Sequence, residues 1–582
     1  MTVFERYTQG ASLLFMAVIF VPITAGVVGV ILPAFGYFPA LGSEQFNVQA
    51  FHAFFAQPSN LKMIQLSFTT GVMATVIAVT GTFVILAFLY NTTLLSRVQR
   101  LISPLLVLPH AGIAIALLFV LSPAGLFSKL LNQFGVGEYG LVPVNWVFPY
   151  DEHGVAIVFA LALKELPFIL LMALGVMAQP QVVKTVQGYS KAAIMMGNSP
   201  ESAFFKVVLP VIYPQIRLPI LAVLAFSTAN VEIPLLLGPN NPATLGVAVV
   251  QWFNHVDLSL RFQASAAAMI QVGVTLSALL VWCLIEKGIG LFSKTYFLSK
   301  ESGLFKHMVK FFATGILTLY AIVSALVLFS VIMWSFSTYW TFSSLLPDGL
   351  TLLHWQTALG SLGPVVLNTV ALGGSVSVVA VVLTLLTLEF ESAHGKDNTI
   401  GYSPKIFAVL LFLPLLVPGV AFLYGLVWFQ QRFLPDTIFL SLFIAHLVYV
   451  LPYVFISLAV AYRKLDSRYE QVASSLGKTP WQVFTQIKLP LLISPLLVAL
   501  ALGIAISVAQ YLPTLLVAAG QYTTITTEAV ALASGSSRRL TAVYVVIQAL
   551  LPWLFFSLAW WLSPRLFSPS ERLNFFKRAR GV

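Results

Sequence analysis

A few ionisable and polar side chains stand within long apolar stretches of the sequence, where such groups are costly unless they have a function or a partner. Two interpretations are open. The charged residues line a polar pathway through a membrane, or an ion pair between Lys164 and Glu232 joins two neighbouring helices. Glu232 is also expected to face Gln510 and to form part of a gate. The candidate pathway residues are Lys164, Glu165, Asn230, Glu232, Gln510 and Tyr511.

The sequence lacks the spacings that enzyme sites need. Residues 476–479 read Leu-Gly-Lys-Thr, like the end of a phosphate-binding loop, but Val472 stands where that loop requires a glycine. The eight histidines are scattered without cysteine partners, so neither a metal site nor a cofactor is expected. His110 is interpreted as a hydrogen-bonded packing residue. With no nucleophile in a catalytic context, the pattern predicts transport rather than enzymatic chemistry, with ATP hydrolysis by a separate subunit.

The elements that carry these residues are predicted to be membrane-spanning helices. Of the 582 residues, 59% are hydrophobic and only 9% are charged. Only helices satisfy their own backbone polar groups in lipid, so the chain is expected to be an all-α polytopic membrane protein. About twelve apolar stretches are long enough, near 11–35, 63–90, 101–122, 154–178, 212–238, 263–286, 311–336, 364–389, 406–428, 437–461, 491–518 and 541–563.

The distribution of basic residues predicts the orientation of these spans. With a cytoplasmic N-terminus, 23 of the 31 Lys and Arg residues fall in cytoplasmic segments. This asymmetry follows the positive-inside rule and predicts that both termini are cytoplasmic. The net charge of +11 therefore indicates no nucleic-acid partner. The basic tail contacts anionic lipid or is simply solvated.

The order of features occurs twice along the chain, which indicates an internal duplication. Span two ends as VIAVTGTFVILAFLY and span eight as VVAVVLTLLTLEF. Residues 191–210 match residues 471–490 without a gap. The predicted divisions are an N-terminal lobe (1–290), a cytoplasmic linker (291–310), a C-terminal lobe (311–565) and a basic tail (566–582).

Each repeated cytoplasmic loop reads as a helix, a glycine, a short amphipathic helix and then Leu-Pro at the start of the next span. Gly197 and Gly477 are expected to take the positive φ that the turn requires. The apolar residues after each glycine recur at helical spacing and must be buried against something. A single loop would pack on its own spans, but two copies with the same spacing favour a partner protein.

These loops resemble the EAA loop of ABC importer permeases, whose pattern is Glu-Ala-Ala, three residues, Gly, nine residues, Ile, one residue and Leu-Pro. The resemblance implies that each loop sits in a cleft of an ATP-binding subunit. The first position departs from the family, although Glu470 precedes Gln471. The implied coupling residues are Lys191, Ala192, Ala193, Gly197, Phe204, Leu209 and Pro210 in the first loop, and Gln471, Ala473, Gly477, Trp481, Phe484, Ile487, Leu489 and Pro490 in the second.

The six-plus-six arrangement is similar to fused permeases of the ferric-iron, thiamine and polyamine importer group. Three segments, LPHAGIAIAL (108–117), KELPFILLM (164–172) and AQYLPTLL (509–516), look closer to the Ynj-type permeases. This resemblance implies the type I importer fold in a bacterial inner membrane, with one fused chain per complex. Its implied partners are two ATPase subunits and a periplasmic binding protein. The alternative is a secondary transporter driven by an ion gradient. Neither interpretation predicts which substrate is transported.

Overall fold

A computed structural model of the chain describes residues 3–90, 92, 94, 95, 98, 108–135, 142, 146–298, 303–342, 344–394, 411, 413–434, 437–535 and 537–566. In these ranges the chain is helical, with two isolated β-bridges and no β-strand. The expected all-α fold is therefore confirmed.

The helices follow the expected order in both halves. Those before residue 300 are α1 (Val3–Ala34), η1 (Pro39–Leu41), α2 (Gln49–Phe55), α3 (Pro58–Leu89), α5 (His110–Leu121), α6 (Leu126–Gln133), α7 (Val155–Met177), α8 (Pro180–Met195), α9 (Pro200–Ala203), η2 (Phe204–Val208), α10 (Leu209–Thr228), α11 (Glu232–Leu237), α12 (Leu245–Phe253) and α13 (Leu260–Leu298). Those after it are α14 (Gly303–Phe336), α15 (Leu353–His394), η3 (Gly419–Ala421), α17 (Leu423–Phe433), α18 (Ile438–Tyr462), α19 (Ser467–Ser475), α20 (Pro480–Val483), η4 (Phe484–Lys488), α21 (Leu489–Ala509), α22 (Leu512–Ala518), α23 (Ile525–Ala533) and α24 (Arg538–Leu566).

Eleven helical segments of the described residues are long and apolar enough to cross a membrane. They correspond to eleven of the twelve predicted spans. The remaining predicted span, 406–428, begins at residues outside the described ranges. Its described part contains the short helices η3 and α17.

Two predicted spans, 212–238 and 491–518, are not continuous, so that expectation was wrong. The first breaks between α10 and α11, and the second between α21 and α22. Pro234 and Pro513 follow the breaks and have no N–H to donate to the carbonyl four residues earlier. At the first break, Asn230 Oδ1 accepts the backbone N–H of Ile233 at 2.9 Å, a local bond that competes with the helix.

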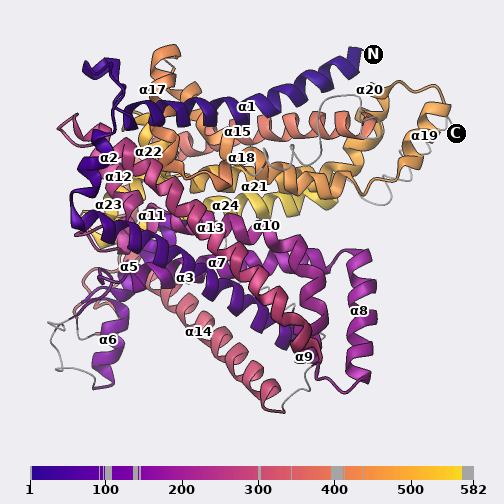
Figure 1. The fold of residues 1–582 in the computed structure, drawn as a ribbon, viewed down its shortest axis with the longest axis horizontal. Coiled ribbons are helices and arrows are strands. Elements are labelled where there is room, and N and C mark those ends of the chain that lie inside the picture. Colours follow the sequence, from indigo (N-terminus) through magenta and orange to yellow (C-terminus); the bar gives the residue numbers. More distant parts are fainter. Residues whose placement is uncertain are drawn as a thin grey trace.

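The two repeated loops lie at the same end of the bundle. Figure 1 shows α8 and α9 from the first loop and α19 and α20 from the second at its right-hand end, together with the start of α1. The short helices α2, α6, α11, α12, α22 and α23 gather at the other end. The breaks in the spans therefore lie far from the loops along the helix axes.

The first helix of each half packs against the other half. Helix α1 lies along α15 and α17 as well as α13, and α14 lies along α3 and α5 as well as α24 (Figure 1). At one crossing the backbones touch, because a Cβ atom added to Gly425 would lie 1.9 Å from the carbonyl oxygen of Gly26. The halves are therefore interlocked rather than merely adjacent.

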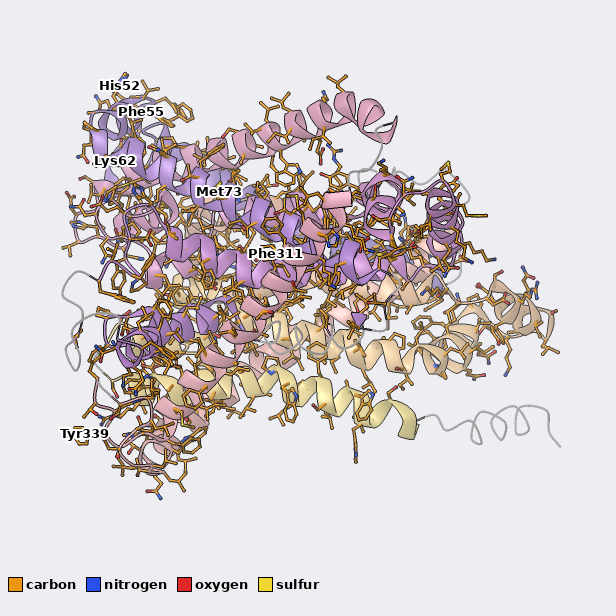
Figure 2. All side chains as sticks on the ribbon, turned by 90° about the horizontal axis from the view of Figure 1, so that it is seen from below. His52, Phe55, Lys62, Met73, Phe311 and Tyr339 are labelled. Carbon is orange, nitrogen blue, oxygen red and sulfur yellow. The ribbon has the colours of Figure 1, made fainter. Side chains whose placement is uncertain are left out.

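The flanks of the bundle carry exposed apolar side chains. Met73 on α3 and Phe311 on α14 are 51% and 73% exposed, and Figure 2 shows both on the side of the bundle. The polar residues His52 and Lys62 lie at one end of it. Apolar flanks and polar ends are the distribution expected of a bundle whose flanks face lipid.

Candidate functional site

Each repeated loop is built around a glycine in the left-handed region. Gly197 has a φ of 87° and Gly477 a φ of 77°, as the sequence predicted. In the first loop α8 ends at Met195 and α9 begins at Pro200; in the second, α19 ends at Ser475 and α20 begins at Pro480. The same local chemistry thus builds the same turn twice.

The second helix of each loop continues into the next span instead of ending at Leu-Pro. One wide turn, η2 or η4, joins it to α10 or α21. Pro210 and Pro490 follow these turns and cannot donate a helical hydrogen bond, and a wider turn relieves the clash between the proline ring and the preceding carbonyl. Movement of the loop can therefore pass along a continuous helix.

The predicted coupling residues divide into buried and exposed sets that match between the loops. Ala193 and Ala473 are buried, whereas Lys191 and Gln471, in place of the family's Glu, are exposed. Phe204 is fully buried and Phe484 is 4% exposed, so the chain itself covers most of the apolar face behind each glycine. The other residues named for the loops are exposed or intermediate: Ala192, Gly197, Leu209, Pro210, Gly477, Trp481, Ile487, Leu489 and Pro490.

Large apolar side chains are exposed just before each glycine. Met195 and Met196 are 88% and 75% exposed, and Leu476, which aligns with Met196, is 76% exposed. Trp481 adds a half-exposed ring after the second glycine. Exposed apolar side chains at an end of the bundle that also carries polar groups are typical of a contact surface. The sequence interpretation missed this surface because it considered only the residues after the glycines.

Each loop also contacts the first helix of the other half. Phe4 of α1 packs against the rings of Trp481 and Phe484, at centroid distances of 5.3 and 5.6 Å. Phe305 of α14 packs against Phe205 at 5.8 Å. Because α1 and α14 lie along the opposite halves, each loop is packed against a helix that the linear order of the chain assigns to the other lobe.

The candidate pathway residues gather where the two halves meet. His110 Nε2 and Glu165 Oε1 lie 3.1 Å apart, so His110 is hydrogen-bonded as expected. Lys164 donates to the backbone carbonyl of Leu108 and lies within electrostatic reach of Glu165 and Glu232. The polar side chains of α7 thus meet the beginning of α5.

Glu232 brings the two helix breaks together. Its carboxyl group lies beside the backbone N–H groups of Ala111 in α5 and Tyr511 in the second break. Its Oε2 atom is enclosed and has no hydrogen-bond partner among the described residues. Asn230 Oδ1 accepts the N–H of Ile233 in the first turn of α11, and Gln510 is half-buried next to Tyr511. Glu232 therefore lies beside Tyr511. The gate hypothesis named Gln510, which is the preceding residue.

Two tyrosines of α18 belong to the same region and were not predicted. Tyr449 lies within electrostatic reach of Glu232, and Tyr453 within reach of Glu165. When the Leu-Pro pairs of α7 and α18 are aligned, Tyr449 takes the place of Lys164. That alignment would have identified it from the sequence.

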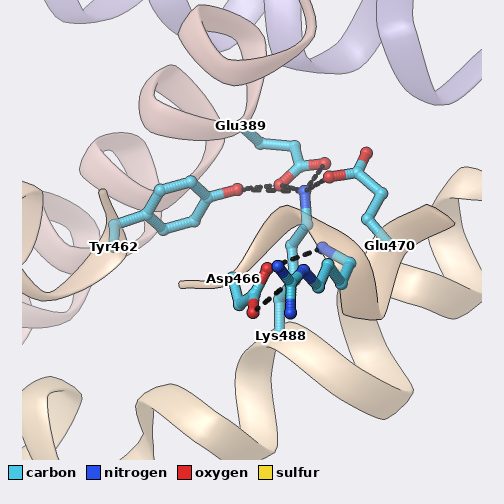
Figure 3. A network of polar contacts seen from close by, with 6 residues as sticks. Glu389, Tyr462, Asp466, Glu470 and Lys488 are labelled. Carbon is cyan, nitrogen blue, oxygen red and sulfur yellow. Dashed lines mark hydrogen bonds and ion pairs between the residues drawn. The ribbon is translucent and has the colours of Figure 1, made fainter. Parts of the chain in front are cut away.

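A buried polar network at the base of the second loop was also missed. Lys488 Nζ lies 2.8 Å from Glu389 Oε1 and 3.2 Å from Glu470 Oε2, and Tyr462 donates to the Glu389 carboxylate (Figure 3). Glu389 stands within the apolar string of span eight. The cost of an ionisable group in a span was the signal that could have revealed it.

The comparisons with known proteins agree with this architecture. Residues 403–568 match the family described as the binding-protein-dependent transport system inner membrane component. This match lies in the second half of the chain, and a relative aligned along nearly the whole chain is an ABC transporter permease, so the helical, membrane-spanning chain is similar to the permease components of ABC transporters. It is a multi-pass membrane protein, and permeases of this family work with ATPase and substrate-binding partners.

The relative in question is the inner membrane ABC transporter permease protein YnjC of Escherichia coli (strain K12). It is 25% identical to this chain over 543 residues, which cover 93% of this chain and 94% of the relative. A putative 2-aminoethylphosphonate transport system permease protein, PhnV of Salmonella choleraesuis (strain SC-B67), is 28% identical over 245 residues, covering 40% of this chain and 89% of the relative.

Proposed function

We propose that the chain is the fused permease of a binding-protein-dependent importer, which moves a small solute into the cytoplasm of a bacterium by alternating access. The observation that carries this proposal is the pair of matched loops at one end of the bundle, each with exposed apolar side chains around a left-handed glycine. Two such surfaces on one chain suit two identical partners, which would be two copies of an ATPase subunit.

The mechanism follows from linkage between nucleotide binding and the conformation of the permease. ATP holds the two ATPase subunits together, so it favours the permease conformation in which the two loops are closest. Because each loop continues into a span without a helix break, its movement is carried into the bundle. The bundle then opens outward to receive solute from a periplasmic binding protein, and hydrolysis resets it.

The solute is proposed to pass the central polar region. Two carboxyl groups and three tyrosines lie there beside Lys164, and Glu232 has an enclosed oxygen without a hydrogen-bond partner among the described residues. Both helix breaks meet at this point, and broken helices in transporters commonly surround the substrate site. Glu232, Gln510 and Tyr511 are the proposed gate residues. Lys164 and Glu165 would line the pathway next to these gate residues.

Co-purification tests the proposal. The tagged chain, extracted gently from its own host, is expected to bring down an ABC ATPase whose hydrolysis rises when loaded binding protein is added. Gly477→Pro should reduce the recovered ATPase, because proline cannot take a φ of 77° and the docking turn is lost. Gly477→Asn is the matched control, since asparagine tolerates the left-handed region and should retain the ATPase.

Recovery of the folded chain without any ATPase would contradict the proposal. Solute uptake that follows an ion gradient and persists without ATP would instead indicate a secondary transporter with Lys164, Glu165 and Glu232 as coupling groups. Full ATPase recovery and activity with Gly477→Pro would show that the loops are not the docking sites.

A further inference from the structure

The network at the base of the second loop joins three separate elements through one nitrogen atom. Lys488 is the last residue of η4, Glu389 lies in α15, and Glu470 lies in α19. The side chains of Lys488 and Glu389 are only 8% and 9% exposed, whereas that of Glu470 is 46% exposed. A buried, hydrogen-bonded ion pair is directional, so it holds these elements in one relative orientation.

Tyr462 adds a fourth element to the network. It is the last residue of α18, and its hydroxyl group contacts both the Glu389 carboxylate and, at 3.4 Å, Lys488 Nζ. Figure 3 shows the side chains of Tyr462, Glu389 and Lys488 meeting at one point. Helix α19 packs on α20, and the contact between Glu470 and Lys488 ties α19 directly to the residue that precedes α21.

The first loop lacks the three side chains that form this network in the second. In the aligned strings Ala87 stands in place of Glu389, Val208 in place of Lys488 and Ser190 in place of Glu470. Val208 is fully buried, and the ring of Phe204 lies 6.0 Å from that of Tyr90. The positions of Glu389 and Lys488 are thus taken by apolar side chains in the first half, and apolar packing is not directional.

Glu470 also bears on the departure from the family pattern at Gln471. Glu470 precedes the position of the family's Glu, but its carboxylate turns inward to Lys488 instead of standing free at the surface. Two carboxylates therefore share one ammonium group beneath the second loop. One carboxylate oxygen of Glu470, the acidic residue that would replace the family's Glu, therefore contacts Lys488 within the chain.

We propose that Lys488 is a positioning residue that transmits movement of the second loop to the spans, through its contacts with Glu389 and Glu470, and that the two loops are therefore mechanically unequal. This inference rests on the proposed function, because it concerns how the ATPase moves the permease. Movement of α19 pulls on Lys488, and Lys488 draws the ends of α15 and α18 with it. The first loop has no ion pair at the equivalent positions, where Ala87, Val208 and Ser190 stand.

The test measures ATP-driven movement directly and needs no known solute. Spin labels are placed on cysteines at Val256 and Arg432, two exposed outer positions in different halves, in a Cys283→Ser background that has no other cysteine. The complex of the full chain with its co-purified ATPase is compared with and without ATP and vanadate. The label-to-label distance is expected to change in the unaltered chain.

Three variants separate transmission from folding. Lys488→Met leaves the Glu389 carboxylate buried without its positively charged partner, so it can fail to fold for that reason alone. The double variant Lys488→Met with Glu389→Gln removes both charges and is expected to fold and bind the ATPase. Arg463→Met is the matched control, because it breaks a neighbouring but exposed ion pair with Glu391, and such pairs contribute little.

The double variant is expected to keep ATP hydrolysis within about twofold. It is also expected to lose most of the ATP-dependent change in the label-to-label distance, because the coupling between ATP binding and movement of the spans falls about tenfold. Arg463→Met should keep both. The inference is wrong if the double variant shows the full distance change, or if it no longer assembles with the ATPase, because the network would then serve packing or assembly. If the unaltered chain recovers no ATPase, the proposed function itself has failed.

Discussion

Glu232 combines two properties that are rarely found together inside a helix bundle. It is ionisable, and one of its carboxylate oxygens is enclosed without a hydrogen-bond partner among the described residues. An oxygen of this kind is costly to bury unless it is used in another state of the protein. Its neighbours Ala111 and Tyr511 come from different halves, so a relative movement of the halves would change its surroundings.

Thiol accessibility tests whether position 232 lines a pathway. In the Cys283→Ser background, Glu232→Cys is expected to react with a small hydrophilic thiol reagent about ten times faster than Ile233→Cys, because a thiol packed in apolar surroundings is inert. Ile233 is the matched control, since it is adjacent and fully buried. Addition of ATP and vanadate should alter the rate at position 232 only. Equal, slow reaction at both positions would assign Glu232 a purely structural role.

At the scale of helices, α1 and α17 approach each other closely. A Cβ atom added to Gly26 would lie 2.1 Å from the carbonyl oxygen of Phe422, and one added to Gly29 would lie 2.7 Å from the Cα atom of Gly425. Small residues allow such close approach, and the resulting packing is a main source of helix association in lipid. The contact holds the first helix of the chain against the second half.

A pair of alanine substitutions in α1 tests this contact. Gly26→Ala is expected to destabilise the protein by about 1–3 kcal/mol, because the carbonyl of Phe422 belongs to backbone and cannot move aside cheaply. Gly10→Ala has open space around the new methyl group and should be neutral or stabilising by up to about 1 kcal/mol. Thermal unfolding of the purified chain in detergent measures both. Equal melting temperatures would show that the crossing adds no stability.

The whole molecule has two chemically different ends. The loops and the start of α1 lie at one end, and the short helices that follow the breaks lie at the other (Figure 1). In the sequence, 23 of the 31 Lys and Arg residues fall in segments predicted to be on the same side of the membrane as the loops. The positive-inside rule assigns the loop end to the cytoplasm. This orientation is what the proposed ATPase contact requires, and it is an independent prediction because it depends on charge alone.

Labelling of intact cells tests the orientation. Val256→Cys, at a position 94% exposed between α12 and α13, should react with a membrane-impermeant maleimide from outside. Lys478→Cys, exposed in the second loop, should react only after the membrane is permeabilised. Both use the Cys283→Ser background. The reverse pattern would place the loops outside the cell and exclude a cytoplasmic ATPase partner.

Local features of the sequence determined the helices, the duplicated order and the glycine turns at 197 and 477. These are predictable because hydrophobic length and a positive φ depend on residues close together in the chain. The central polar residues were also identified, because a charge in an apolar span is unusual wherever it packs.

Only the tertiary structure decided which surfaces are covered and which halves meet. The burial of Phe204 and Phe484, the crossing of Gly26 with α17 and the pairing of Lys488 with Glu389 all join residues distant in the sequence. The helix breaks before Pro234 and Pro513 were likewise decided by the tertiary structure. Proline alone does not predict a break, because Pro167 and Pro452 lie within unbroken spans. Whether a span bends or breaks depends on the partners that its freed backbone groups find in neighbouring helices.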